Sequence, residues 1–131
     1  PERSCVAGGG GRILLVDDEE MILGPVTAIL SDAGYDVVAC KDGADAIERF
    51  RKEPESFVLV ILDMVMPNLS GRDVFVALRE IAGNVRVLVT SGYDREGYVD
   101  ELMKMGAAGF IRKPYRSATL TQAVREAIGT T

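Results

Sequence analysis

Near the middle of the chain, six consecutive apolar residues run directly into a carboxylate. The run from Phe57 to Leu62 predicts a strand that is buried on both faces, which is typical of a parallel sheet. Asp63 follows at once, and because burying an unpaired carboxylate is costly, we expect it at the carboxyl end of the strand, on a loop at the edge of the sheet. Pro67 and the turn formers after it predict that the chain leaves the sheet and starts a helix near Ser70.

Four more strand patterns alternate with helical patterns along the chain. The predicted strands lie at 12–16, 36–40, 57–62, 85–90 and 107–111. The predicted helices lie at 19–33, between Asp42 and Pro54, between Ser70 and Gly83, at 94–105, and from Ser117, which could cap the last one. Right-handed crossovers lay helices on both faces of a sheet, so this alternation predicts a doubly wound α/β domain in which all strands run parallel.

The composition bears on the number of domains, on the kind of partner and on the cellular location. The chain has 131 residues, of which 47% are hydrophobic, and we expect one domain at 12–129 after a flexible, Gly-rich linker or tail at 1–11. A net charge of −5 with dispersed basic residues argues against a nucleic-acid surface, and no apolar run is long enough to span a membrane. Cys5 and Cys40 form no CxxC motif and have no histidine to complete a zinc site, which favours free thiols and a cytoplasmic location over a disulfide.

Polar side chains gather where the predicted strands end. They are Asp17, Asp18, Asp63, Ser91 and Lys113. Each residue alone has an ordinary interpretation, as a helix-terminal acid, a strand cap, a turn residue or a solvated lysine. The carboxyl ends of parallel strands meet at one edge of the sheet, however, and that edge is where such sheets bind ligands. Their joint placement therefore indicates a functional site.

With these motifs, the chain resembles the receiver domain of bacterial two-component response regulators over nearly all of 12–128. The resemblance rests on the acidic pair Asp17-Asp18, on Asp63 in the segment Leu-Asp-Met-Val-Met-Pro, and on Lys113 before a proline. It implies a flavodoxin-like, five-stranded parallel sheet in the order 2-1-3-4-5 with five helices. It also implies that Asp63 is the phosphoacceptor.

Two adjacent hydroxyls could serve the site that the resemblance implies. The family keeps a hydroxyl residue at the end of the fourth strand. Ser91 stands 28 residues after Asp63 and 22 before Lys113, which is the spacing of typical family members. We therefore assign this hydroxyl position to Ser91 and expect Thr90 to point into the core. Phe110, three residues before the lysine, matches the aromatic switch position of the family.

The resemblance further implies a Mg²⁺ site, because phosphoryl transfer needs charge neutralisation and Mg²⁺ prefers oxygen ligands. The implied ligands are Asp18 and Asp63 directly, Asp17 through water, and the backbone carbonyl of Val65. Lys113 would contact one phosphoryl oxygen and Ser91 another, and the Lys113-Pro114 bond would be cis.

The implied function is a phosphoacceptor in a two-component phosphorelay. The chain contains no histidine, so the donor must be a phosphohistidine on a partner, either a histidine kinase or a histidine phosphotransfer domain. The change would be read by a downstream protein at the face formed by the helix at 94–105, the strand at 107–111 and the last helix. Such a domain is a switch that phosphorylates and dephosphorylates itself rather than a turnover enzyme, and it could stand alone or belong to a hybrid histidine kinase.

Three alternatives fit less well. A hydrolase of the haloacid-dehalogenase type also forms an aspartyl-phosphate, but its second aspartate would fall at Val65. A receiver-like binding module that is not phosphorylated would show a gap among Asp17, Asp18, Asp63 and Lys113, and none is missing. A flavodoxin-like flavin binder needs a phosphate-cradling loop after the first strand, where the acids at 17–20 would repel phosphate.

Overall fold

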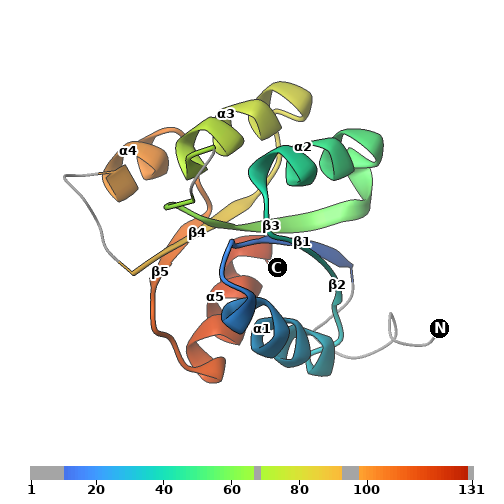
Figure 1. Cartoon of the computed structure of the whole chain (residues 1–131), viewed down its shortest axis with the longest axis vertical. Coiled ribbons are helices and arrows are strands. Elements are labelled where there is room, and N and C mark those ends of the chain that lie inside the picture. Colours follow the sequence, from blue (N-terminus) through green and yellow to red (C-terminus); the bar gives the residue numbers. More distant parts are fainter. Residues whose placement is uncertain (1–10, 67–68, 93–97, 130–131) are drawn as a thin grey trace.

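The structure is an alternating α/β fold (Figure 1); the computed structural model describes residues 11–66, 69–92 and 98–129. The strands are β1 (Arg12–Val16), β2 (Asp36–Cys40), β3 (Phe57–Asp63), β4 (Val87–Ser91) and β5 (Gly109–Arg112). The helices are α1 (Glu20–Asp32), α2 (Gly43–Lys52), α3 (Gly71–Ile81), α4 (Tyr98–Lys104) and α5 (Ser117–Ile128), with a short 3-10 helix, η2 (Pro54–Ser56).

The five strands form one parallel sheet in the order β2-β1-β3-β4-β5, as predicted. The fourth strand begins two residues later than expected, because Val85 belongs to a tight turn in which its N–H donates to the carbonyl of Ala82. Likewise the N–H of Ala107 donates to the carbonyl of Leu102 in α4, so β5 starts only at Gly109. The strand pattern therefore located each strand, but it placed the starts of β4 and β5 two residues too early and the ends of β3, β4 and β5 one residue too early.

Two apolar cores sandwich the sheet. On one face, Ile13 of β1 and Ile61 of β3 pack with residues of α1 and α5. These two helices cover the same face of the sheet in Figure 1. On the other face, Leu14 and Leu62 pack with α2, α3 and Leu102 of α4. Because successive side chains of a strand point to opposite faces, a strand covered on both sides is apolar throughout, which explains the uninterrupted run before Asp63.

The helix starts separate correct from incorrect capping predictions. Asp42 caps α2 by accepting a hydrogen bond from the N–H of Ala44 at 3.0 Å, and Ser70 caps α3 by accepting one from the N–H of Asp73 at 3.2 Å. The prediction that Ser117 caps α5 is wrong. Arg116 takes the N-cap position in extended conformation, with φ −88° and ψ 160°, so Ser117 is already helical. A helical serine is no longer placed to accept from the first turn.

The structure also bears on the thiol and membrane expectations. Cys40 is a buried free thiol, and its burial, together with the charge of Asp45, raises its pKa to about 12. Cys5 and Pro67 lie outside the described residues, as does the linker except for Gly11, whose carbonyl accepts from the N–H of Asp36. Among the helices described, none has the length and apolar character needed to cross a membrane.

Candidate functional site

Three strands carry charged residues to the same end of the sheet. Asp17 follows β1, Asp63 is the last residue of β3, and Lys113 follows β5. Asp63 was expected on a loop, but it still pairs with Thr90 of β4, and the ladder continues through the N–H of Met64, which donates to the Thr90 carbonyl. Asp63 is therefore held by the sheet itself, which fixes its backbone more firmly than a loop would.

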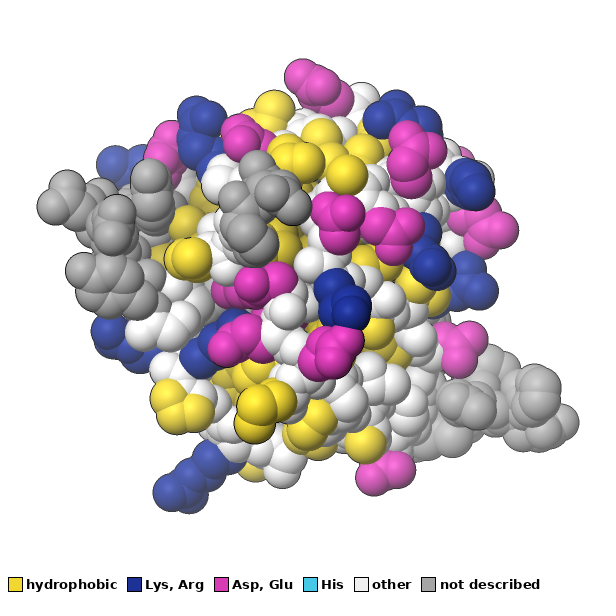
Figure 2. Space-filling view, in the orientation of Figure 1, with side chains coloured by type: hydrophobic (Ala, Val, Ile, Leu, Met, Phe, Trp, Pro, Cys, Tyr) yellow, Lys and Arg dark blue, Asp and Glu magenta, His cyan; other side chains and the backbone are white. Residues whose placement is uncertain are grey.

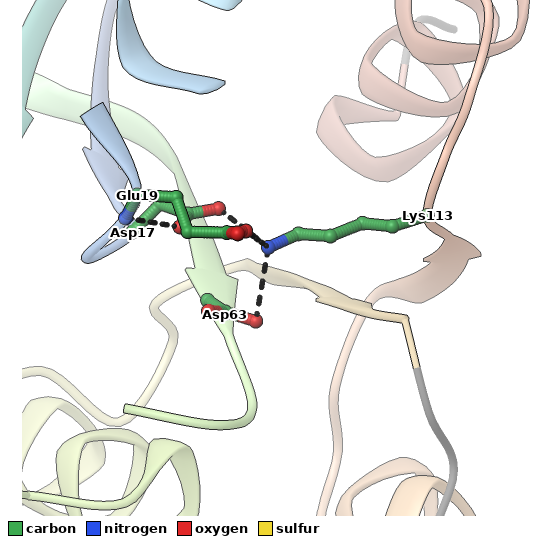
Figure 3. Close-up of polar contacts among 4 residues, drawn as sticks. All are labelled: Asp17, Glu19, Asp63 and Lys113. Carbon is green, nitrogen blue, oxygen red and sulfur yellow. Dashed lines mark hydrogen bonds and ion pairs between the residues drawn. The ribbon is translucent and has the colours of Figure 1, made fainter. Parts of the chain in front are cut away.

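Lys113 lies at the centre of the site and contacts three carboxylates (Figure 3). Its Nζ is 2.8 Å from Oδ2 of Asp17, 3.4 Å from Oδ1 of Asp63 and 3.2 Å from Oε1 of Glu19. The side chains of Asp17 and Asp63 are only 2% and 5% exposed, whereas that of Glu19 is 60% exposed. The Lys113-Pro114 bond is cis, as the resemblance implied.

The buried charges shift each other's ionisation. Burial, followed by the nearby charge of Asp17, raises the pKa of Asp63 to about 6, although Lys113 and the backbone N–H of Val65 partly offset the shift. Burial alone would lower the pKa of Lys113, but its hydrogen bonds and charge interactions with the carboxylates outweigh this and raise that pKa above its ordinary value. The site therefore holds more negative charge than its lysine balances, which makes it receptive to a cation.

Three of the carboxylates are close enough to share a metal ion. Asp17, Asp18 and Asp63 each offer an oxygen within 4.8 Å of the others, and they are the one such group found among the described residues. Hard carboxylate oxygens suit Mg²⁺, which keeps several water ligands beside one or two carboxylates. Asp18 opens on a shallow pocket of about 350 Å³, which Val65 and Gly92 also line, so water and small anions can reach the group. The donor set therefore fits Mg²⁺.

The start of α3 holds the chain that follows Asp63. The N–H of Gly71 donates to the carbonyl of Met64 at 3.0 Å. A Cβ at Gly71 would lie 2.7 Å from the carbonyl oxygen of Asp63 and 2.7 Å from Cα of Met64, which is too close for any side chain. Glycine is therefore required here because the helix terminus packs directly against the backbone of the site.

Ser91 and Thr90 are both buried, so burial does not separate their roles. Strand alternation places Ser91 on the same face as Val89, against which Phe110 packs in the neighbouring strand. The carbonyl of Ser91 also accepts from the N–H of Lys113 at 2.9 Å, which joins the ends of β4 and β5 beside the site. The assignment of Ser91 over Thr90 stays a prediction.

Sequence reasoning missed one member of the site. Glu19 was predicted only as the start of the helix at 19–33, and it does occupy the N-cap of α1, where its N–H donates to Oδ1 of Asp17 at 2.9 Å. Its carboxylate, however, turns back to Lys113. The signal was the run of four acids at 17–20, of which only the first two were assigned to the site.

Comparisons with known proteins agree with this geometry. A family model described as the response regulator receiver domain matches residues 13–125. The chain is 29% identical over 119 residues to the chemotaxis protein CheY of Thermotoga maritima. The aligned region covers 89% of this chain and 97% of that protein.

Solved structures give the same picture. A response regulator receiver domain protein from Clostridium thermocellum superposes with a TM-score of 0.85 at 30% identity, covering 90% of this chain and 94% of the other. The CheX-CheY-BeF₃-Mg²⁺ complex from Borrelia burgdorferi superposes with a TM-score of 0.83 at 27% identity, covering 88% and 87%. Other curated relatives are longer, and the chain spans 52% of one regulator and 13% of one sensor kinase.

Proposed function

Because this chain belongs to the response regulator receiver family of two-component signalling, we propose that it is phosphorylated on Asp63 by a phosphohistidine of a partner. One observation carries the assignment: the Asp63 carboxylate is fixed at the end of the central strand, lines the open pocket and lies 3.4 Å from Lys113. Receiver domains pair with histidine kinases, and the donor here is either such a kinase or a histidine phosphotransfer domain.

The transfer uses groups that the site already holds. A carboxylate oxygen of Asp63 forms a bond to phosphorus while the bond from phosphorus to the imidazole nitrogen breaks, and that nitrogen keeps the electron pair and takes up a proton. Lys113 offsets negative charge on one phosphoryl oxygen, and the Ser91 hydroxyl donates to another. The same groups stabilise the product, so the acyl phosphate is both the product of the transfer and the signal.

Asp18 and Asp63 would hold Mg²⁺ directly, with Asp17 through water and the backbone carbonyl of Val65 completing the protein ligands. When bound, the ion would neutralise charge on the phosphoryl oxygens. Two findings support this: the oxygens of the acidic group lie within 4.8 Å of one another, and the similar Borrelia protein was solved with BeF₃ and Mg²⁺.

We further propose that the phosphorylated state is read by a downstream protein at the face formed by α4, β5 and α5 (the α4-β5-α5 face). Ser91 would move toward the phosphoryl group, and Phe110 would fill the space left behind. Ser91 of β4 and Phe110 of β5 lie on the same face of the sheet, which supports this coupling. This movement would also remodel the surface near Tyr98, whose side chain lies outside the described part of the structure.

The protein to which this domain contributes is also a proposal. The domain is a self-phosphorylating and self-dephosphorylating switch rather than a turnover enzyme. It works in the cytoplasm, either as a stand-alone regulator or as a module of a hybrid histidine kinase. The match to nearly the whole of a CheY supports the first form, and the match to part of a sensor kinase supports the second.

Phosphorylation by acetyl phosphate with Mg²⁺, followed by intact mass spectrometry, tests the assignment. The wild type should gain one phosphoryl group, and Asp63→Asn should gain none. Asp36→Asn is the matched control, since Asp36 is an exposed carboxylate at the opposite end of the sheet, and it should label like the wild type. Labelling retained in Asp63→Asn would refute the assignment.

A further inference from the structure

The exposed carboxylate of Glu19 completes the coordination of Lys113. A lysine ammonium has three N–H donors, and the Nζ of Lys113 has three carboxylate partners, in Asp17, Asp63 and Glu19. With all three partners in place, no donor is left for an arriving phosphoryl oxygen. One carboxylate must therefore release the lysine before it can contact a phosphoryl group.

Glu19 is the partner that can leave at least cost. The side chains of Asp17 and Asp63 are almost fully buried, so a carboxylate that left the lysine there would lose its one ion-pair partner among the described side chains, in a poorly solvated position. Glu19 is 60% exposed, and water can solvate its carboxylate at once. Its place in the fold does not depend on the ion pair, because its backbone rather than its side chain is held, by the hydrogen bond to Asp17.

We propose that Glu19 is a specificity-determining residue that competes with the phosphoryl group for Lys113 and thereby slows phosphorylation by small anionic donors. This inference rests on the proposed function of Asp63. Two effects act in the same direction: the ion pair occupies a donor that the phosphoryl oxygen needs, and the charge of Glu19 at the pocket repels an anion that enters it.

Removing this carboxylate leaves the lysine in place. In Glu19→Gln, Lys113 is still held by Asp17 at 2.8 Å and by Asp63 at 3.4 Å. We therefore expect phosphorylation by acetyl phosphate to be about two- to fivefold faster than in the wild type, which is the scale of one partly exposed ion pair. Phosphoramidate carries less negative charge than acetyl phosphate, so its rate should rise less. Both differences should shrink as salt is added.

Glu20→Gln is the matched control. It removes the same charge one residue along the chain, but Glu20 pairs with Lys41 and does not contact Lys113. Its rates should stay at the wild-type value. Beryllofluoride binding, followed by NMR in the presence of Mg²⁺, gives a second readout without a covalent step, and Glu19→Gln should bind about two- to fivefold more tightly.

The outcomes separate this inference from the proposed function. If the wild type is not labelled at Asp63, both the proposed function and the role of Glu19 are refuted. If the wild type labels at Asp63 but Glu19→Gln reacts and binds no better than Glu20→Gln, Glu19 does not compete for the lysine. Slower reaction of Glu19→Gln would also overturn the inference, because it would mean that Glu19 positions Lys113 for the reaction.

Discussion

The two ends of the sheet differ in size and in chemistry. The amino end has the larger pocket, about 600 Å³, with a lining that includes Phe50, Ile81 and Ile128. The carboxyl end has a pocket of about 350 Å³, which contains Asp63 and Lys113. The acidic group that could hold a metal lies only at the carboxyl end of the described structure. The smaller pocket is the functional one because strand topology, rather than pocket volume, decides where reactive side chains converge.

The two ends also differ in how they contribute to stability. At the amino end, Phe50 and Phe57 stack with ring centroids 5.9 Å apart, and Arg12 covers the Phe57 ring. These contacts are stabilising at any charge state of the site. At the carboxyl end, Asp17 and Asp63 are buried side by side, and one lysine offsets them. On the face drawn in Figure 2, basic and acidic side chains are interspersed at the surface.

The largest expected effect is the loss of the central lysine. Lys113→Met leaves Asp17 and Asp63 buried without their cation, and in chelator it should lower the free energy of unfolding by about 3 kcal/mol. Lys41→Met is the control, because it breaks an ion pair at the surface and should melt close to the wild type. Urea unfolding of the three proteins measures the difference, and equal losses in both variants would contradict the contrast between buried and exposed charge.

A smaller effect is expected where α3 packs on the site. Gly71→Ala forces a Cβ against the backbone of Asp63 and Met64, and should cost about 2 kcal/mol. Gly24→Ala is the matched control inside α1, where a Cβ meets nothing within 4 Å, and it should stabilise the protein by about 0.5 to 1 kcal/mol. Thermal melts give the sign directly. If Gly71→Ala melts like the wild type, the backbone at Asp63 and Met64 can move aside without a loss of stability.

The smallest effect distinguishes two helices that begin after strands ending at the site. Ser70→Ala removes the hydroxyl that caps α3 and should cost about 1 kcal/mol. Ser117→Ala removes a hydroxyl from the first helical residue of α5 and should have little effect, because this serine caps nothing. If the two variants lose the same stability, Ser117 does cap α5. Chemical denaturation of both variants under the same buffer conditions measures the pair.

Much of the fold follows from the sequence because the signals are local. A strand covered by helices on both faces must be apolar throughout, and Phe57 to Leu62 meets that requirement in one uninterrupted run. Where tertiary contacts decide the bounds of a strand or the cap of a helix, the sequence-based prediction was wrong. Val85 has the residue type of a strand but belongs to a turn, and Ser117 has the residue type of a cap but lies one residue too late.

The site could be predicted only as far as topology brings residues together. The convergence of Asp17, Asp63 and Lys113 follows from parallel strands, whichever rotamers they adopt. The role of Glu19 depends on its side-chain direction at the start of α1, which no periodicity encodes. The continuation of the ladder to Asp63 likewise depends on the register with Thr90, a pairing between strands that are far apart in sequence.

A set of four melts tests most directly whether Asp63 belongs to a repulsive acidic metal site. Wild type and Asp63→Asn are melted at low ionic strength, each in chelator and in saturating Mg²⁺. Because Asp63→Asn removes one of the crowded charges, it should be more stable than the wild type in chelator by about 1 to 2 kcal/mol, and Mg²⁺ should then add less to it than to the wild type. If the variant is no more stable in chelator, or gains as much from Mg²⁺ as the wild type does, Asp63 is not part of such a site.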